Sequence, residues 1–521
     1  MEGNKMATAR TKYGIVSGIE ETGGVHAFLG IPYAKPPVGE LRFKPPQEPE
    51  NWSGVKECKS YGAPSLQLVT DNHRTTARVL SISAEDCLYL NIRTKAPLAE
   101  AENGVKNMNE AKNDAPVDHT AKLPVYVFIH GGAYETGGGN MRQYEGQAFA
   151  EDDIIYVNIN YRLGIFGALA LDTLRAESGV TGCLQVLDAA QAVKWIHENI
   201  GAFGGDPDNI TVGGESAGAF TVSVLMCMPE LKGMFRRCIL ESGSIRAGIT
   251  SAFYGHGNPR SAVERSRIVI AGLGCDDTPE GLEKLRNIPA EELLYNWHFD
   301  NNGDQRGFSS NPVLDGLLFK GDCMPDPRAQ TPNPVDLLFG FNTNEGTMFA
   351  DQAAAPADYE EKLRIMFPEH WQEILAKYPV DAEHTPWQRL SDIYGLQKFQ
   401  GAMLPYADVL AEMGNSVYAY HFDYMTDRLR KEGLGVRHIA ELPFVFNRFL
   451  NVVGADDEKG NKMSRVMHSA WSSFIKTGDP SRGWEKYTPA ARRAMCFSAE
   501  GIVFRDIDRV EEMLWIDGLL K

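Results

Sequence analysis

The pentapeptide Gly214-Glu215-Ser216-Ala217-Gly218 constrains the fold of this chain more than any other feature of its sequence. It lies between an apolar, strand-like run at 210–212 and a helix-like run at 219–226. A serine between two glycines at a strand-to-helix junction forms a nucleophile elbow, whose turn is so tight that its neighbours must be small. The pattern predicts a strained Ser216 whose hydroxyl projects over a sheet, at the positive end of a helix. The alternative is an ordinary glycine-rich turn with a capping serine.

Apolar runs of strand length recur along the chain, and several of them are continuous rather than alternating. The expected strands lie at 88–92, 125–129, 154–159, 210–212, 238–242, 335–339 and 417–420, and a helical pattern covers 187–200. Continuous apolar runs indicate strands buried on both faces, as in a parallel sheet covered by helices. We therefore expect an α/β fold with a mostly parallel central sheet flanked by helices. Ligands of such folds bind beyond the carboxyl ends of the strands, where Ser216 would lie.

A serine hydroxyl needs a base, and in folds with this elbow an acid and then a histidine follow the serine along the chain. His438 is the best candidate for the base, because it ends a glycine-rich loop at 433–438 directly before an apolar segment. His468 lies in a helical pattern and His421 in a strand-like one, which favours packing roles for both. The alternative for His438 is a structural loop histidine.

The acid should follow a strand between Ser216 and His438. Glu345 does so, because a loop at 341–346 carries it just beyond the expected strand at 335–339. Asp315 and Asp392 compete with it, although the Asp315-Gly316 pair is typical of a simple turn.

A nucleophile elbow also requires backbone N–H groups that stabilise a developing oxyanion. His130-Gly131-Gly132-Ala133 follows the expected strand at 125–129 and is of the type that forms this hole. The expected donors are Gly132 and Ala133, joined by Ala217 after the nucleophile. The neighbouring glycines at 137–139 are followed by no Gly-Lys-Ser/Thr, which argues against a phosphate-binding loop.

Charge and composition exclude several classes of function. The chain has 521 residues and a formal net charge of −17, which disfavours binding to nucleic acid or to anionic lipid. No apolar run is long enough to span a bilayer, and the first ten residues do not read as a secretory signal. The eight cysteines include no Cys-x-x-Cys pair. We expect free, mostly buried thiols, a cytoplasmic location, and no metal or cofactor.

Composition changes between 95 and 122, where Ala, Glu, Asn, Lys and Asp dominate and large apolar residues nearly vanish. This segment is predicted to be a mobile surface insertion.

Taken together, the motifs resemble those of the type-B carboxylesterase family, which includes the cholinesterases. The resemblance covers nearly the whole chain. It rests on the elbow and on the segments 30–34, 42–43, 85–91, 160–164, 203–207 and 477–480. It implies one α/β-hydrolase domain over 1–521, with long insertions that form the pocket.

The resemblance also implies roles for single residues. Ser216 matches the nucleophile, Glu345 the acid and His438 the base, and Gly132, Ala133 and Ala217 match the oxyanion donors. Arg42 and Glu85 resemble a structural ion pair, and Ser242 a hydroxyl that supports the triad. Cys87 matches a half-cystine of secreted relatives, but Ser65 stands where its partner is expected, which suggests an intracellular, bacterial-type esterase.

We therefore expect a serine esterase that hydrolyses carboxylic esters of uncharged small molecules through an acyl-serine intermediate. An amidase or lactonase with the same triad is one alternative, and a non-catalytic binding protein on the same scaffold is another. A haloalkane- or epoxide-type hydrolase is disfavoured, because it would need an aspartate in place of Ser216. The sequence leaves the physiological substrate and the oligomeric state open.

Overall fold

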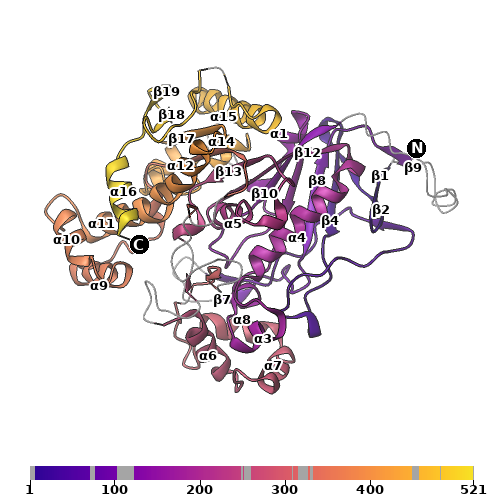
Figure 1. Cartoon of the computed structure of the whole chain (residues 1–521), viewed down its shortest axis with the longest axis horizontal. Coiled ribbons are helices and arrows are strands. Elements are labelled where there is room, and N and C mark those ends of the chain that lie inside the picture. The colour runs from indigo at the N-terminus through magenta and orange to yellow at the C-terminus, as the bar shows by residue number, and fades with distance from the viewer. Residues whose placement is uncertain are drawn as a thin grey trace.

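A twisted central sheet organises the molecule (Figure 1). The structure, a computed structural model, describes residues 6–70, 77–101, 122–247, 250–251, 260–307, 309–314, 327–328, 332–448, 457–481 and 483–519. Within these ranges the sheet has eleven strands, in the order β19-β18-β17-β16-β13-β12-β10-β11-β8-β4-β3. Their bounds are β3 (Ile19–Glu21), β4 (Val25–Pro32), β8 (Tyr89–Thr94), β10 (Leu123–Ile129), β11 (Ile155–Ile159), β12 (Gly205–Glu215), β13 (Arg237–Glu241), β16 (Asp336–Asn342), β17 (Val417–Asp423), β18 (Arg493–Ser498) and β19 (Gly501–Asp506).

The middle of this sheet is parallel, and its two ends are antiparallel. All pairings from β11 through β18 are parallel, whereas β19 and the strands β8, β4 and β3 pair antiparallel with their neighbours. The chain therefore has the α/β-hydrolase type of sheet, and each strand that the sequence predicts lies within two residues of an observed one or inside it.

Alternate residues of β10 show how the sheet is covered. Val125, Val127 and Ile129 pack in the core that includes α4 (Leu184–Asn199) and α5 (Ala217–Leu225). Tyr126 and Phe128 pack in a second core with α1 (Gln147–Glu151), α14 (Leu442–Val445) and α15 (Glu458–Thr477). Because both faces of the strand are buried, its run of apolar residues is continuous.

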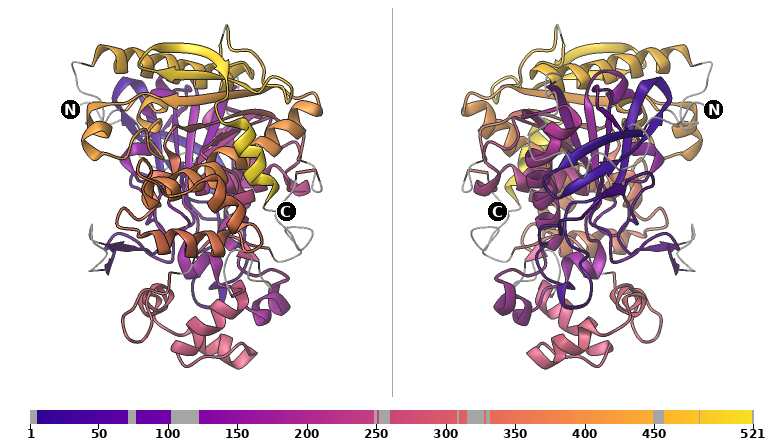
Figure 2. Two further views of the ribbon diagram at one scale, coloured as in Figure 1. Left: turned by 90° about the vertical axis from the view of Figure 1, so that its left-hand side faces the viewer. Right: turned by 90° about the vertical axis from the view of Figure 1, so that its right-hand side faces the viewer.

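A small second sheet and a group of helices lie outside the central sheet. A small sheet, β5-β2-β1-β9, forms from β1 (Met6–Thr11), β2 (Gly14–Ser17), β5 (Val55–Glu57) and β9 (Ala99–Ala101). The predicted insertion at 95–122 thus contributes β9, and its residues 102–121 lie outside the described part of the chain. The helices α6 (Ala262–Gly272), α7 (Pro279–Arg286) and α8 (Ala290–His298) form a lobe beneath the sheet (Figure 2).

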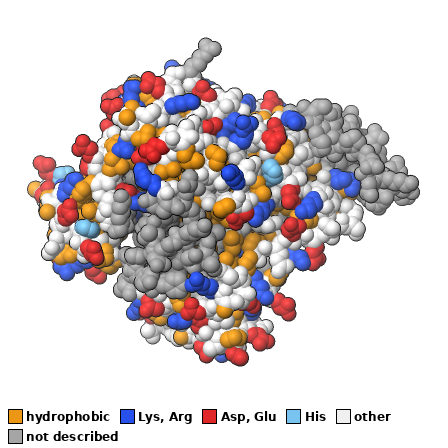
Figure 3. Space-filling model, viewed as in Figure 1, with side chains coloured by type: hydrophobic (Ala, Val, Ile, Leu, Met, Phe, Trp, Pro, Cys, Tyr) orange, Lys and Arg blue, Asp and Glu red, His pale blue; other side chains and the backbone are white. Residues whose placement is uncertain are grey.

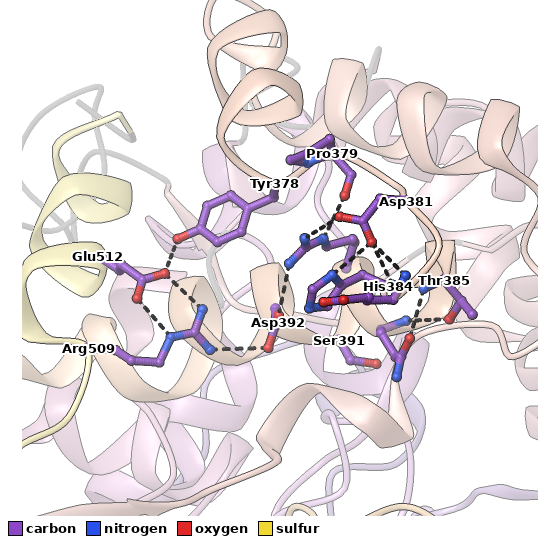
Figure 4. A network of polar contacts seen from close by, with 12 residues as sticks. Tyr378, Pro379, Asp381, His384, Thr385, Ser391, Asp392, Arg509 and Glu512 are labelled. Carbon is purple, nitrogen blue, oxygen red and sulfur yellow. Dashed lines mark hydrogen bonds and ion pairs between the residues drawn. The ribbon is translucent and has the colours of Figure 1, made fainter.

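The C-terminal helix α16 (Val510–Gly518) joins the main body through charged contacts (Figure 4). Arg509 contacts Glu512 with two nitrogens, at 3.0 and 2.9 Å, and reaches Asp392 of α11 (Pro386–Tyr394) at 3.1 Å. Tyr378 donates a hydrogen bond to Glu512. These contacts join α16 to α11 and to Tyr378.

Two expectations about the whole chain can be compared with the structure. Seven cysteines are described, and all seven are buried and form no disulfide within the described residues, Cys58 and Cys87 included, whereas Cys323 lies outside these residues. Among the described helices, none has the length and apolarity needed to cross a membrane. On the face in Figure 3, acidic and basic side chains are interspersed rather than separated into large areas of one sign.

Candidate active site

The elbow has the backbone geometry that the sequence predicts. β12 ends at Glu215 and α5 begins at Ala217, so that Ser216 alone forms the junction, with φ 54° and ψ −123°. Small neighbours are obligatory here: a Cβ on Gly218 would stand 1.9 Å from the carbonyl oxygen of Ile129, and one on Gly214 2.5 Å from the backbone of Gly218. The elbow is therefore strained and closely packed on both sides.

Glu345 follows β16 and is fully buried. Its Oε1 accepts hydrogen bonds from the Asn342 amide at 2.6 Å and from the Ser242 hydroxyl at 2.7 Å. Its Oε2 lies 2.6 Å from His438 Nδ1. The carboxylate is thus held in one orientation, with one oxygen left for the histidine.

The loop that carries His438 is fastened directly to the loop that carries Glu345. Asn344 donates its amide to the Val436 carbonyl and accepts the Val436 amide on its side chain, both at 2.9 Å. Gly435 has φ 70°, and a Cβ there would meet the Asn344 side chain at 2.2 Å. The glycine-rich loop therefore lets the two segments approach closely, which brings His438 to Glu345 across 93 residues of chain.

The opposite nitrogen of His438 faces a second carboxylate. His438 Nε2 lies 2.9 Å from Oε1 of Glu215, the residue before the elbow serine. In the described part of the chain, the Ser216 hydroxyl makes no hydrogen bond with His438. The imidazole also packs against Phe399, with ring centroids 4.4 Å apart, and against Phe349 at 5.2 Å. The sequence reasoning missed the contact with Glu215.

Burial and charge act on the ionisable groups of the site in opposite directions. Burial opposes a charged imidazole, but the charges of Glu215 and Glu345 outweigh it and raise the pKa of His438 to about 10. Burial raises the pKa of Glu215. The same effect, joined by the charge of Glu345, raises the pKa of nearby Glu441 to about 8. Asn342 donates to Glu441 at 2.6 Å and links it to this cluster.

Gly132 and Ala133 lie in the loop after β10, and Ala217 is the first residue of α5. Gly131 touches the elbow, since a Cβ on it would stand 3.0 Å from the Cβ of Ser216. Within the described residues no hydrogen bond uses the amides of Gly132, Ala133 or Ala217. Ala133 is exposed, whereas Ser216 itself is buried.

The alternative candidates for the acid and the base that the structure describes make contacts elsewhere. His468 Nδ1 bonds the Val445 carbonyl at 2.7 Å, and His421 Nε2 lies 2.9 Å from the Thr343 hydroxyl. Asp392 pairs with Arg509, and Asp315 falls outside the described residues. Of the candidates for acid and base, the structure brings together Glu345 and His438.

The expected ion pair is formed: Arg42 bonds both oxygens of Glu85, at 2.6 and 2.5 Å. In the described part of the chain, no group of three or more His, Cys, Asp and Glu side chains is arranged to hold a metal ion.

Comparison with known proteins adds independent findings. The model of the carboxylesterase family matches residues 5–509. The chain is 31% identical over 519 residues to para-nitrobenzyl esterase of Bacillus subtilis (strain 168), covering 95% of this chain and 96% of that protein. It is 30% identical over 535 residues to human neuroligin-2, covering 92% of this chain and 61% of neuroligin-2.

Comparison with solved structures also identifies esterases as similar proteins. A PNB esterase structure superposes with a TM-score of 0.79 at 30% identity, covering 99% of this chain and 100% of the other. The carboxylesterase EST55 of Geobacillus stearothermophilus gives a TM-score of 0.77 at 33% identity, covering 98% and 99%.

Proposed function

This chain belongs to the carboxylesterase family, and on that premise we propose that it is a serine esterase whose nucleophile, acid and base are Ser216, Glu345 and His438. The observation that carries the proposal is the 2.6 Å contact between His438 and Glu345, made by two loops that meet beside the strained elbow. A carboxylate on Nδ1 fixes the imidazole and stabilises its charged form, as a serine hydrolase requires.

The reaction follows from these positions. Ser216 Oγ attacks the ester carbonyl carbon while its proton passes to His438 Nε2. The amides of Gly132, Ala133 and Ala217 stabilise the oxyanion. The bond to the alcohol breaks as His438 returns the proton to the leaving oxygen. Water then attacks the acyl group on Ser216, giving its proton to His438, and the acid is released with the serine regenerated.

Before attack His438 must be neutral and must turn from Glu215 toward Ser216. The charges of Glu215 and Glu345 oppose this neutral form, because they raise the pKa of His438 to about 10. Glu215 and Ser216 are adjacent in the chain, so the proposed turn of the imidazole is from one residue to its neighbour.

The proposed substrates are uncharged esters with an apolar part, and the proposed partners include neither nucleic acid nor membrane. Buried carboxylates around His438 and the net charge of −17 disfavour anionic substrates. Phe349, which is exposed, and Phe399 stack at 5.0 Å beside the catalytic histidine and offer an apolar contact. The proposal includes a cytoplasmic, bacterial setting, which the seven described cysteines, none of them in a disulfide, and the Bacillus relative support.

Covalent labelling tests the proposal. Treatment with a fluorophosphonate, followed by intact-protein mass spectrometry and peptide mapping, should give one adduct on Ser216. The adduct should be absent from Ser216→Ala and strongly reduced in His438→Ala. Folded wild-type protein that hydrolyses no p-nitrophenyl ester and takes no label would refute the proposal. That result would favour a non-catalytic binding protein, an alternative we retain because of the similarity to neuroligin-2.

Activity assays on the wild-type protein test the amidase and lactonase alternatives. Rates on matched ester, amide and lactone versions of one substrate identify an amidase or a lactonase, because the triad is common to all three and only the leaving group differs.

A further inference from the structure

The loop after β10 is held in an unusual backbone conformation. Gly132, Ala133 and Tyr134 are consecutive residues with positive φ, at 110°, 55° and 59°. Non-glycine residues persist in this region only when their surroundings hold them there. Since two of these residues carry the proposed oxyanion donors, whatever holds the loop also sets the position of those amides.

Backbone hydrogen bonds and one hydroxyl contact help to maintain this loop conformation. The Gly132 carbonyl accepts the amides of Glu135 at 2.9 Å and Thr136 at 3.1 Å. The Tyr134 carbonyl accepts the Gly164 amide at 2.8 Å, and its hydroxyl lies 3.1 Å from that of Thr221. These contacts close the turn and attach Tyr134 to its neighbours.

Farther along, Gln67 accepts the Gly137 amide at 2.9 Å and donates to the Gly137 carbonyl at 2.8 Å. Next to the two proposed donors, a further attachment uses the only charged side chain between residues 131 and 139, that of Glu135. Its Oε1 accepts the hydroxyl of Ser310, which in turn accepts the indole N–H of Trp297 at 2.9 Å. Its Oε2 lies 3.3 Å from Nε2 of His298, the last residue of α8. The carboxyl group therefore joins the loop to the helical lobe beneath the sheet.

The chemistry of the pair favours a shared proton. Glu135 Oε2 and His298 Nε2 are both buried, and neither has another hydrogen-bond partner in the described part of the chain. Burial raises the pKa of Glu135 to about 7, and burial lowers the pKa of His298 to about 4. A carboxyl O–H that donates to the neutral imidazole would satisfy both atoms.

We propose that Glu135 is a positioning residue, which ties the loop bearing Gly132 and Ala133 to His298 and Ser310 and so fixes the two amides. Its effect on turnover rests on the function proposed above, whereas its effect on the order of the loop does not.

The test compares Glu135→Ala, Glu135→Gln and His298→Ala with the wild type. Glutamine keeps an acceptor for Ser310 and an N–H donor for His298, so it should keep kcat within about 3-fold of the wild type. Glu135→Ala should lower kcat by roughly 10- to 100-fold, the scale of a misplaced catalytic group, with KM within about 2-fold. His298→Ala should lower kcat in the same way, and the double alanine variant should lose less than the product of the two single losses.

Glu177→Ala is the matched control. Glu177 is also a half-buried carboxylate of this region, paired with Arg286 at 2.5 Å, but it has no contact with the loop. Its removal should leave kcat unchanged. Hydrogen exchange of the peptide covering residues 130–137 gives a second readout that needs no activity, and it should rise in Glu135→Ala but not in Glu135→Gln or Glu177→Ala.

The outcomes are separable. Unchanged loop exchange in both Glu135→Ala and His298→Ala would overturn the proposal, and so would equal losses of kcat in Glu135→Ala and Glu135→Gln. If the wild type hydrolyses no ester, the proposed function fails, while the exchange measurement still decides whether Glu135 fixes the loop.

Discussion

At the scale of single residues, the site is dominated by a histidine that lies between two carboxylates. His438 Nδ1 is 2.6 Å from Glu345, and Nε2 is 2.9 Å from Glu215. Both charges favour the imidazolium, and together they raise the pKa of His438 to about 10 against the opposing effect of burial. The base of the proposed reaction is therefore most abundant in its active, neutral form at alkaline pH.

Glu215→Gln tests this description. Removing one of the two negative charges should lower the pKa of His438, so that the neutral base survives at lower pH. The acid limb of kcat/KM for a neutral ester should then move down by about 1–3 pH units.

Glu241→Gln is the control for that experiment, because Glu241 is equally buried but bonds Trp471 at 2.7 Å rather than His438. It should leave the acid limb in place. An acid limb that does not move in Glu215→Gln would show that Glu215 does not set the charge of the base.

The sequence could predict Ser216 and Glu345 as candidates because each follows an apolar, strand-like run. It could predict His438 because a glycine-rich loop places it directly before an apolar segment. It could not predict the rotamer that turns His438 toward Glu215, since this depends on how three separate loops pack. Glu135 was missed for a similar reason: a charged residue in a glycine-rich loop looks solvent-exposed until Ser310 and His298 are brought to it from far along the chain.

At the scale of elements, a helix packs behind Glu345, the proposed catalytic acid. A Cβ on Gly346, the residue after Glu345, would stand 1.9 Å from the Ser391 carbonyl oxygen of α11. Arg509 and Asp392 fasten α11 to the C-terminal helix (Figure 4). The position of the Glu345 loop thus depends on an element that contacts none of the proposed catalytic groups.

Gly346→Ala should therefore displace α11 or the Glu345 loop. We expect overpacking to lower the free energy of unfolding by about 1–3 kcal/mol. We also expect kcat to fall as His438 loses its aligned acid. Urea unfolding and kcat on one ester would measure the two effects.

Gly395→Ala is the control on the opposite side of this contact. Its added Cβ would meet its nearest neighbour at 3.6 Å, an ordinary contact distance, and its φ is −58°. It should be neutral or stabilising by about 0.4–1 kcal/mol, because alanine restricts the unfolded chain more than glycine does. A Gly346→Ala variant as stable and active as Gly395→Ala would contradict the support we describe.

The sequence predicted the central strands better than it predicted the edge strand β19 or the π-helix near the site. Continuous apolar runs gave the central parallel strands, because burial on both faces leaves a strong pattern. The antiparallel β19 was not predicted, since Gly501–Asp506 is only partly buried. The π-helix at Gly395–Gln400, which positions Phe399 against His438, has no local sequence pattern that would indicate it.

At the scale of the whole molecule, burying acidic groups makes stability depend on pH. Burial raises the pKa of Glu441 from 4.5 to about 8, so the folded protein holds a proton in that interval that the unfolded chain has lost. The contribution of such a group is complete below its unfolded value and is lost as pH rises through the folded value. His438, with its raised pKa, acts in the same direction at higher pH.

Glu441→Gln should flatten this dependence. Between pH 4.5 and about 8 the variant should lose less free energy of unfolding than the wild type, by up to about 1.4 kcal/mol per pH unit. Urea unfolding at several pH values measures the slope. Glu50→Gln, which changes an exposed carboxylate, should keep the wild-type slope, and an equal slope in both variants would contradict the assignment.

The two partners of His438 have a consequence for how such a scaffold can change over generations. The buried imidazole forms a hydrogen bond with Glu345 and lies 2.9 Å from Glu215, and neither contact involves the serine hydroxyl. On the proposed mechanism, a chain that lost Ser216 would stop turning over substrate and would still keep His438 paired with Glu345 and its loops joined. Catalysis is thus a separable property of this architecture, and a descendant could abandon it while inheriting the fold intact.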